Sequence, residues 1–265
     1  MTILHGTPRS GILAILWLTA LLGACIHHSY AGTRDWQHFR TVTRTGERRR
    51  LYLKWLIQSI LLFDLGGVMT LWLLPRPLGW TSLTQLRLSH PTPTASTAPP
   101  ETSPAFFIGF GCGILILAGV FLLLRKLKRP LPLKPLGDFA AMIPRTWAEA
   151  GLAFLLCLNA GLGEELFFRL ALPLLTGQLT GSLIAGAALS TLLFGGMHWY
   201  QGLKGVLATT ALGLIFMIRA LNGTPLIWLM GFHTLMDVVA LFIRPALSGH
   251  FSRSTVRQPA VRPSS

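Results

Sequence analysis

Long apolar runs, separated by short basic or polar segments, are the feature that most constrains the fold of this chain. Each run approaches the ~20 residues that a helix needs to cross a bilayer. Of all residues, 51% are hydrophobic and 12% are charged, a composition typical of multi-span membrane proteins. The sequence lacks the period-2 alternation of an outer-membrane barrel. We therefore predict an all-α, multi-pass transmembrane helical bundle with spans near residues 11–28, 51–74, 105–124, 147–177, 182–198, 203–220 and 224–243.

The basic segments between the runs predict the orientation of this bundle. Arginines cluster in 34–54 and lysines join them in Arg125–Arg129, and loops of this kind stay in the cytoplasm. The Pro/Thr/Ser-rich segment 75–104 then lies outside as a flexible loop. Seven spans also keep the basic tail in the cytoplasm. Eight spans, with 147–177 divided in two, would move the tail outside, so we prefer seven and leave eight open.

The same pattern bears on partners, localisation and domain organisation. Topology signals explain the net charge of +14, so we expect a lipid bilayer and no nucleic acid as partner, in a bacterial plasma (inner) membrane. Leu22–Cys25 resembles a lipoprotein cleavage box, but cleavage would leave the first arginine cluster outside, so we prefer an uncleaved span. We expect N-terminal spans in 1–146, a motif-bearing membrane domain in 147–243 and a disordered basic tail in 244–265.

Ionisable residues inside the apolar runs are candidates for a functional site, because a charged side chain near the bilayer centre costs about 2.5–3.5 kcal/mol on insertion. Glu165 and Arg169 lie four residues apart and form a favourable acid-before-base pair on one helix face. Glu164 points about 100° away from Glu165, so we expect it to contact a different group. The candidates inside the runs are Asp64, Glu164, Glu165, His198, His233 and Asp237.

Taken singly, each candidate also has a structural explanation. The pair at Glu165 could pin helices together, His198 could be a packing residue at a helix end, Asp64 could be a polar helix contact, and Asp237 could satisfy the buried imidazole of His233.

Their depth favours a functional layer. Counted from the nearest turns at 1.5 Å per residue, Glu164 lies about 20 Å along its helix and His198 about 24 Å along the next. By the same count His233 lies about 15 Å and Asp237 about 20 Å along the last helix. Three helices therefore present these groups in one layer, in the cytoplasmic half of the membrane. The small residues that flank the layer, and allow close helix approach or water access, are Gly161, Gly163, Gly195 and Gly196.

A buried carboxylate with an imidazole suits general-base activation of water. The HExxH zinc-protease helix and the GxSxG nucleophile elbow are absent from the sequence, so neither of those hydrolase classes is indicated. Carboxylate oxygen and imidazole nitrogen are also acceptable zinc ligands, so a metal-dependent hydrolase stays open at this point.

Three motifs carry a resemblance to a known family. EExxxR at Glu164–Arg169, FxxxH at Phe194–His198 and HxxxD at His233–Asp237 follow one another across successive runs. In this order they resemble the CPBP family of intramembrane proteases, which includes the type II CAAX prenyl endopeptidases and bacteriocin-processing proteins. The resemblance covers roughly residues 147–243, and the N-terminal runs carry no motif that matches.

The resemblance implies an intramembrane endopeptidase that cleaves a membrane-associated or lipidated protein or peptide. Glu164 would activate water, His198 would hold and polarise it, and His233 would stabilise the oxyanion with the residue at Asp237. The family motif often ends in asparagine, and an ionised Asp237 cannot donate a hydrogen bond, so we expect it to orient and charge His233.

Glu165 and Arg169 would support the site structurally, next to the motif residue Phe194. The resemblance favours no cofactor; zinc, held by Glu164, His198, His233 and Asp237, is the alternative. Two other functions stay open: a non-catalytic scaffold or bacteriocin-immunity protein of the same fold, and a transporter or channel that uses the charges as an ion path.

Overall fold

The structure, a computed structural model, describes residues 8–74, 123 and 140–247, and within these residues every regular element is a helix. The predicted span 105–124, the segment 75–104, the basic run Arg125–Arg129 and the tail beyond Leu247 lie outside the described residues. The α-helices are α1 (Pro8–Phe39), α2 (Thr45–Ser59), α3 (Gly66–Leu73), α6 (Trp147–Asn159), α7 (Leu172–Thr180), α8 (Leu183–Met197), α9 (Gly202–Leu221), α10 (Leu226–Val238) and α11 (Arg244–Leu247). The π-helical segments are η1 (Ile60–Leu65), η3 (Ala160–Glu164), η4 (Phe167–Ala171) and η6 (Val239–Ile243), and the 3-10 turns are η2 (Ala140–Met142) and η5 (Trp199–Gln201).

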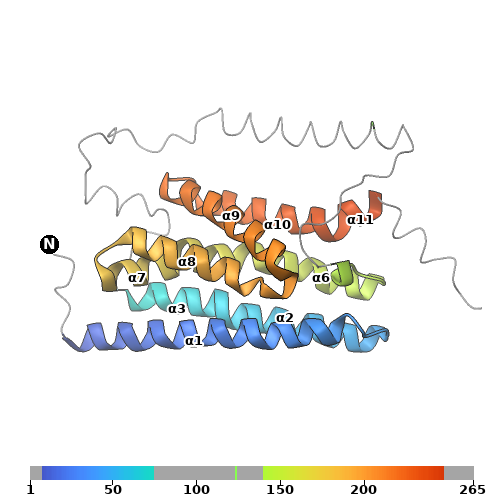
Figure 1. Ribbon diagram of the computed structural model, residues 1–265, viewed down its shortest axis with the longest axis horizontal. Helices are drawn as coiled ribbons and strands as arrows, with labels where there is room; N and C mark the ends of the chain where they lie inside the picture. The colour runs from blue at the N-terminus through green and yellow to red at the C-terminus, as the bar shows by residue number, and fades with distance from the viewer. Residues whose placement is uncertain (1–7, 75–122, 124–139, 248–265) are drawn as a thin grey trace, which may run out of the picture.

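Six of the seven predicted spans fall on described helices. Five helices are long and apolar enough to cross a membrane: Gly11–Phe39, Thr45–Leu73, Trp147–Thr180, Trp199–Leu221 and Leu226–Ala246. Leu183–Met197 is a shorter apolar helix. The fold is thus the predicted all-α, multi-pass bundle, and Figure 1 shows its helices running side by side along the long axis of the molecule.

The predicted span at 147–177 is one continuous helix of 34 residues, Trp147–Thr180, about 50 Å long at 1.5 Å per residue. The division of this segment that eight spans would require is therefore not observed. At Gly161 and Gly163 the helix stays continuous and widens into η3. At the other end of the motif-bearing domain, α11 continues the last helix through Arg244–Leu247, which the sequence placed in the disordered tail.

Local signals explain where the central helices begin and end. The hydroxyl of Thr146 accepts a hydrogen bond from the backbone N–H of Glu149 at 3.2 Å and caps α6, a common N-terminal arrangement. α7 ends at Gly181, whose φ of 73° is the left-handed conformation that favours glycine. Ser182 then caps α8 through the N–H of Ala185. The turn between the predicted spans 147–177 and 182–198 therefore lies at Gly181 and Ser182.

The distribution of side chains is the reverse of that in a water-soluble protein. Large apolar side chains such as Trp72 (76% exposed) and Ile184 (78% exposed) face outward, as is expected where the surroundings are lipid. Several charged side chains are buried instead, among them Arg48, Glu149, Glu165 and Arg169. Since a charge in an apolar interior needs a partner, each of these residues indicates a specific contact.

Aromatic rings join the helices that surround the buried charges. The rings of Phe167 and Phe168 in η4 contact Phe63 of η1 at centroid distances of 5.6 and 5.4 Å. Phe168 also contacts Phe194 of α8 at 5.3 Å. Aromatic pairs at these centroid distances contribute about 0.5–1.5 kcal/mol each beyond their burial. This aromatic cluster fixes η1, η4 and α8 against one another, next to the predicted site.

Candidate functional site

The helix that carries Glu164 is widened on both sides of it. η3 ends at Glu164 and η4 begins three residues later, at Phe167. π-helical turns are rare and are frequent at functional sites, where they re-aim side chains. No sequence pattern indicated this widening.

Three of the four predicted glycines allow close helix approach. A Cβ on Gly161 would meet the hydroxyl of Thr234 and would lie 2.7 Å from the carbonyl oxygen of Met230, so η3 and α10 touch backbone to backbone. A Cβ on Gly163 would lie 2.5 Å from the Asp64 carboxylate. Gly195 is packed in the same way against Thr210 of α9.

The remaining glycine, Gly196, behaves differently, because a Cβ there would meet no atom within 4 Å. The Asp64 carboxylate packs closely against Gly163, and Asp64 is not among the described residues that line the cavity below.

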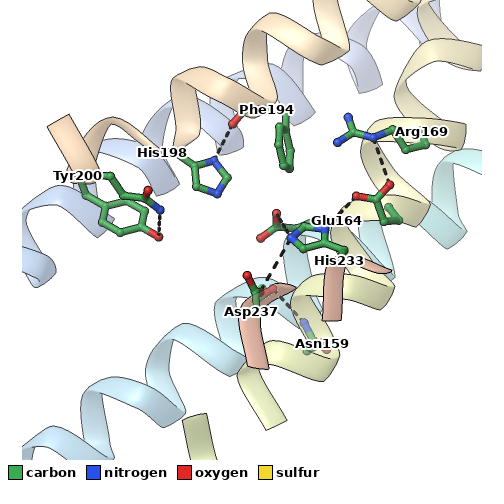
Figure 2. A network of polar contacts seen from close by, with 11 residues as sticks. Asn159, Glu164, Arg169, Phe194, His198, Tyr200, His233 and Asp237 are labelled. Carbon is green, nitrogen blue, oxygen red and sulfur yellow. Dashed lines mark hydrogen bonds and ion pairs between the residues drawn. The ribbon is translucent and has the colours of Figure 1, made fainter. Parts of the chain in front are cut away.

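Glu165 joins Arg169 and His233 in a buried polar network, and Figure 2 labels both of these partners. Arg169 Nε donates to Glu165 Oε2 at 3.1 Å, the predicted pair, and both side chains are at most 1% exposed. His233 Nδ1 donates to the other oxygen, Glu165 Oε1, at 2.8 Å. Both oxygens of this carboxylate are thus occupied, so it connects the EExxxR helix directly to α10.

Glu164 and Asp237 stand on either side of the second nitrogen of His233. His233 Nε2 lies 4.0 Å from Glu164 Oε2 and 3.9 Å from Asp237 Oδ2, distances typical of ion pairs and too long for hydrogen bonds. The sequence assigned the orientation of His233 to Asp237. In the structure Glu165 makes the orienting hydrogen bond, and Asp237, whose side chain is 37% exposed, makes only the longer contact.

His198 binds the helix backbone through one ring nitrogen, so the other nitrogen can accept a proton or a hydrogen bond. Its Nδ1–H donates to the carbonyl oxygen of Phe194 at 2.8 Å, so in the neutral ring Nε2 carries the lone pair and can accept a proton or a hydrogen bond. The Phe194 ring lies 5.0 Å from the His198 ring and 6.1 Å from the His233 ring. On its other side the guanidinium of Arg169 lies 4.4 Å from the Phe194 centroid. Phe194 therefore spaces the two histidines.

These side chains meet at a cavity of about 520 Å³, a size typical of ligand sites. Its walls come from both predicted parts of the chain, since α1, α2 and η1 contribute aromatic residues such as Trp36, Trp55 and Phe63. Glu164, His198, His233 and Asp237 all line it. The layer predicted by counting residues along three helices thus exists in space, although its chemical roles stay predictions.

The zinc alternative depends on how the ligand-type side chains are arranged. Within residues 8–74, 123 and 140–247, no three His, Cys, Asp or Glu side chains form a group that could hold a metal ion. Nδ1 of both His198 and His233 is engaged by a protein acceptor, which leaves Nε2 of each ring as the nitrogen that could bind a metal. Zinc held by Glu164, His198, His233 and Asp237 stays the alternative to a metal-free site.

Two further polar groups were not found from the sequence. Arg48 of α2 pairs with Glu149 of α6 at 3.1 Å, with neither side chain exposed. Tyr200, in the turn after His198, also lines the cavity. The capping pattern from Thr146 to Glu149 could have indicated that a helix starts near Glu149. No local sequence pattern indicates that Glu149 pairs with Arg48, or that the Tyr200 side chain points into the cavity.

Comparison with known proteins finds one family that part of this chain resembles. Residues 146–239 match the model of a family described as type II CAAX prenyl endopeptidase, Rce1-like. No curated protein and no solved structure matches the chain. This match supports the resemblance to CAAX-type intramembrane endopeptidases that the three motifs indicated, and the long apolar helices show an integral membrane protein. The match contains all three motifs and therefore every predicted site residue.

Proposed function

We propose that this protein is a metal-independent intramembrane endopeptidase that cleaves a membrane-associated or lipidated protein or peptide. The observation that carries the proposal is the shared cavity: Glu164, His198 and His233, from three different helices, line one space between lipid-facing helices. A hydrolase needs a base, a water site and an oxyanion donor within reach of one bond, and these three side chains can supply them.

Glu164 and His198 activate the water. The Glu164 carboxylate accepts a proton from water while His198 Nε2 accepts the other hydrogen in a hydrogen bond. The water oxygen forms a bond to the scissile carbonyl carbon, and the carbonyl π electrons move to the oxygen. When the tetrahedral intermediate collapses, the C–N bond breaks and Glu164 returns its proton to the leaving amine. The products are a carboxylic acid and an amine, with Glu164 restored.

His233 acts on the carbonyl side. With Nδ1–H held by Glu165, a protonated ring directs Nε2–H into the cavity, where it can donate to the developing oxyanion. The carboxylates of Glu164 and Asp237, at 4.0 and 3.9 Å, favour the charged ring by Coulomb attraction. Glu165 and Arg169 act through His233 and are positioning residues.

The test is cleavage of a diverse peptide panel, lipidated and plain, by detergent-purified protein. Wild type is compared with Glu164→Gln, which keeps the shape of the side chain and removes the base. We expect at least a ~10³-fold lower kcat, since loss of a general base commonly removes 10²–10⁴, with an unchanged unfolding temperature. Equal rates in the two proteins would refute the role of Glu164.

A parallel wild-type sample with a chelator tests the metal alternative. We expect no change in rate. Loss of cleavage with chelator, restored by zinc, would replace this mechanism with the metal-dependent one. If wild type cleaves no peptide of the panel while Glu164→Gln still performs the cellular function, the protein is a scaffold instead.

Orientation is part of the proposal, since the site is expected in the cytoplasmic half of a bacterial inner membrane. A reporter fused after Ser265 should report the cytoplasm, and a periplasmic signal would contradict seven spans.

A further inference from the structure

The turn that follows α8 aims a phenol at the cavity from the side opposite α10. His198 ends α8, and η5 folds back through a hydrogen bond from the Gln201 N–H to the His198 carbonyl at 2.9 Å. Gly202 then starts α9 with a φ of 76°, a conformation that requires glycine. This sharp turn places Tyr200 beside His198 instead of on the next helical face.

Two rings hold the Tyr200 side chain. Its ring lies 6.0 Å from the His198 ring at an interplanar angle of 28°, and 5.5 Å from the Trp36 ring at 62°. Both contacts are made by the ring, so they leave the hydroxyl at its tip free to face elsewhere. In Figure 2 that hydroxyl points toward Glu164 and Asp237.

The Tyr200 hydroxyl can still donate a hydrogen bond. Gln201 Nε2 donates to the Tyr200 oxygen at 3.0 Å, and in the described part of the chain this is the hydroxyl's one hydrogen bond. A phenol can accept one bond and still donate one, so the amide fixes the oxygen and leaves its O–H available. Gly205 makes room for this arrangement, because a Cβ there would collide with the Gln201 side chain.

The proposed reaction needs such a donor. Glu164 and Asp237 are acceptors when ionised, and Nδ1 of His198 is taken by Phe194. His233 Nε2–H is thus one donor to the oxyanion, and a second donor in the same layer would divide the developing charge.

We propose that the Tyr200 hydroxyl is a catalytic oxyanion donor, which binds the scissile carbonyl oxygen opposite His233 and takes over the role that the carboxylate of Asp237 cannot fill. This proposal rests on the proposed peptidase function. The Tyr200 O–H bond stays intact throughout, and the hydroxyl only donates a hydrogen bond that strengthens as the carbonyl oxygen becomes negative.

The experiment compares wild type, Tyr200→Phe and Tyr30→Phe on a peptide that wild type cleaves. Tyr200→Phe keeps the ring contacts with His198 and Trp36 and removes the hydroxyl. We expect an about 100-fold lower kcat, the usual effect of one lost oxyanion donor, with KM within about twofold of wild type and an unchanged unfolding temperature. Tyr30, which is 67% exposed, provides the matched loss of a hydroxyl and should leave both constants unchanged.

A second variant, Gln201→Leu, leaves the phenol in place but removes the amide that fixes it. We expect an about fivefold lower kcat, the effect of one neutral hydrogen bond. Tyr200→Phe with wild-type kcat, or with a raised KM alone, would overturn the donor role while leaving the peptidase intact. Failure of wild type to cleave any peptide would instead overturn the peptidase proposal, and the donor role would fall with it.

Discussion

The protein buries two arginine–glutamate pairs that are alike at close range. Arg169–Glu165 lies beside the cavity and Arg48–Glu149 lies where α2 meets the start of α6, and each joins Nε to Oε2 at 3.1 Å. Each guanidinium also lies over a phenylalanine ring, at 4.4 Å from Phe194 and at 4.1 Å from Phe39. Burial and pair geometry do not distinguish a structural pair from one that serves a site.

The surrounding hydrogen bonds do distinguish them. Arg48 Nη2 donates to the carbonyl oxygens of Ala141 at 2.9 Å and Ile143 at 3.4 Å, and Glu149 accepts from the N–H of Arg145 at 3.0 Å. The further hydrogen bonds of this pair thus go to backbone groups, and they hold the segment before α6 onto α2.

Glu165, in contrast, accepts a hydrogen bond from His233 on its second oxygen. The carboxylate beside the cavity is completed by an ionisable ring, so any change in it reaches the site. What each pair binds besides its own partner, backbone in one case and His233 in the other, therefore distinguishes the two pairs, and the ion-pair geometry does not.

Neutralising each glutamate in the same manner tests whether the two ion pairs differ in function. Glu149→Gln and Glu165→Gln both leave a buried arginine without its counter-charge, which commonly costs about 3–5 kcal/mol. We expect similar losses of unfolding temperature, measured by tryptophan fluorescence in detergent. Glu165→Gln should also lower kcat about 100-fold, whereas folded Glu149→Gln should cleave within about twofold of wild type. A loss of kcat in Glu149→Gln would remove the distinction.

Replacing both partners of each ion pair by apolar residues tests the same difference in a second way. Arg169→Met/Glu165→Leu should regain most of the stability lost in the single variant, since a buried pair is often replaceable by apolar side chains. It should stay inactive, because His233 Nδ1 then lacks its acceptor. Arg48→Met/Glu149→Leu should stay active but regain less stability, because each backbone group that it leaves unpaired costs about 1–3 kcal/mol. Unfolding temperatures in the opposite order would contradict this account.

The sequence predicted those parts of the site that depend on regular helix geometry. Glu165 and Arg169 are one turn apart, so their pairing follows from helix periodicity. The common depth of Glu164, His198 and His233 follows from a fixed rise per residue once the turns are located.

The unpredicted parts depend on contacts between distant segments. The bond from His233 to Glu165 joins residues 68 positions apart, and the one from Arg48 to Glu149 joins residues 101 positions apart. No local pattern specifies either partner. The widening in η3 and the fold-back of η5 are departures from regular helix geometry, so the aim of Glu164 and of Tyr200 could not be counted from residue spacing.

The smallest expected changes in kcat and stability come from two glycine substitutions along one helix. Gly161 lies beside the cavity, and Gly151 lies near the Arg48–Glu149 pair. Gly161→Ala forces η3 away from the Met230 carbonyl and Thr234 of α10, and such overpacking costs about 1–3 kcal/mol. It also moves Glu164 away from His233, so we expect an about tenfold lower kcat. Gly151 has no atom within 4 Å of an added Cβ, and Gly151→Ala should raise stability by up to about 1 kcal/mol through helix propensity without changing kcat. Equal responses at the two glycines would mean that the contact between η3 and α10 does not set the geometry of the site.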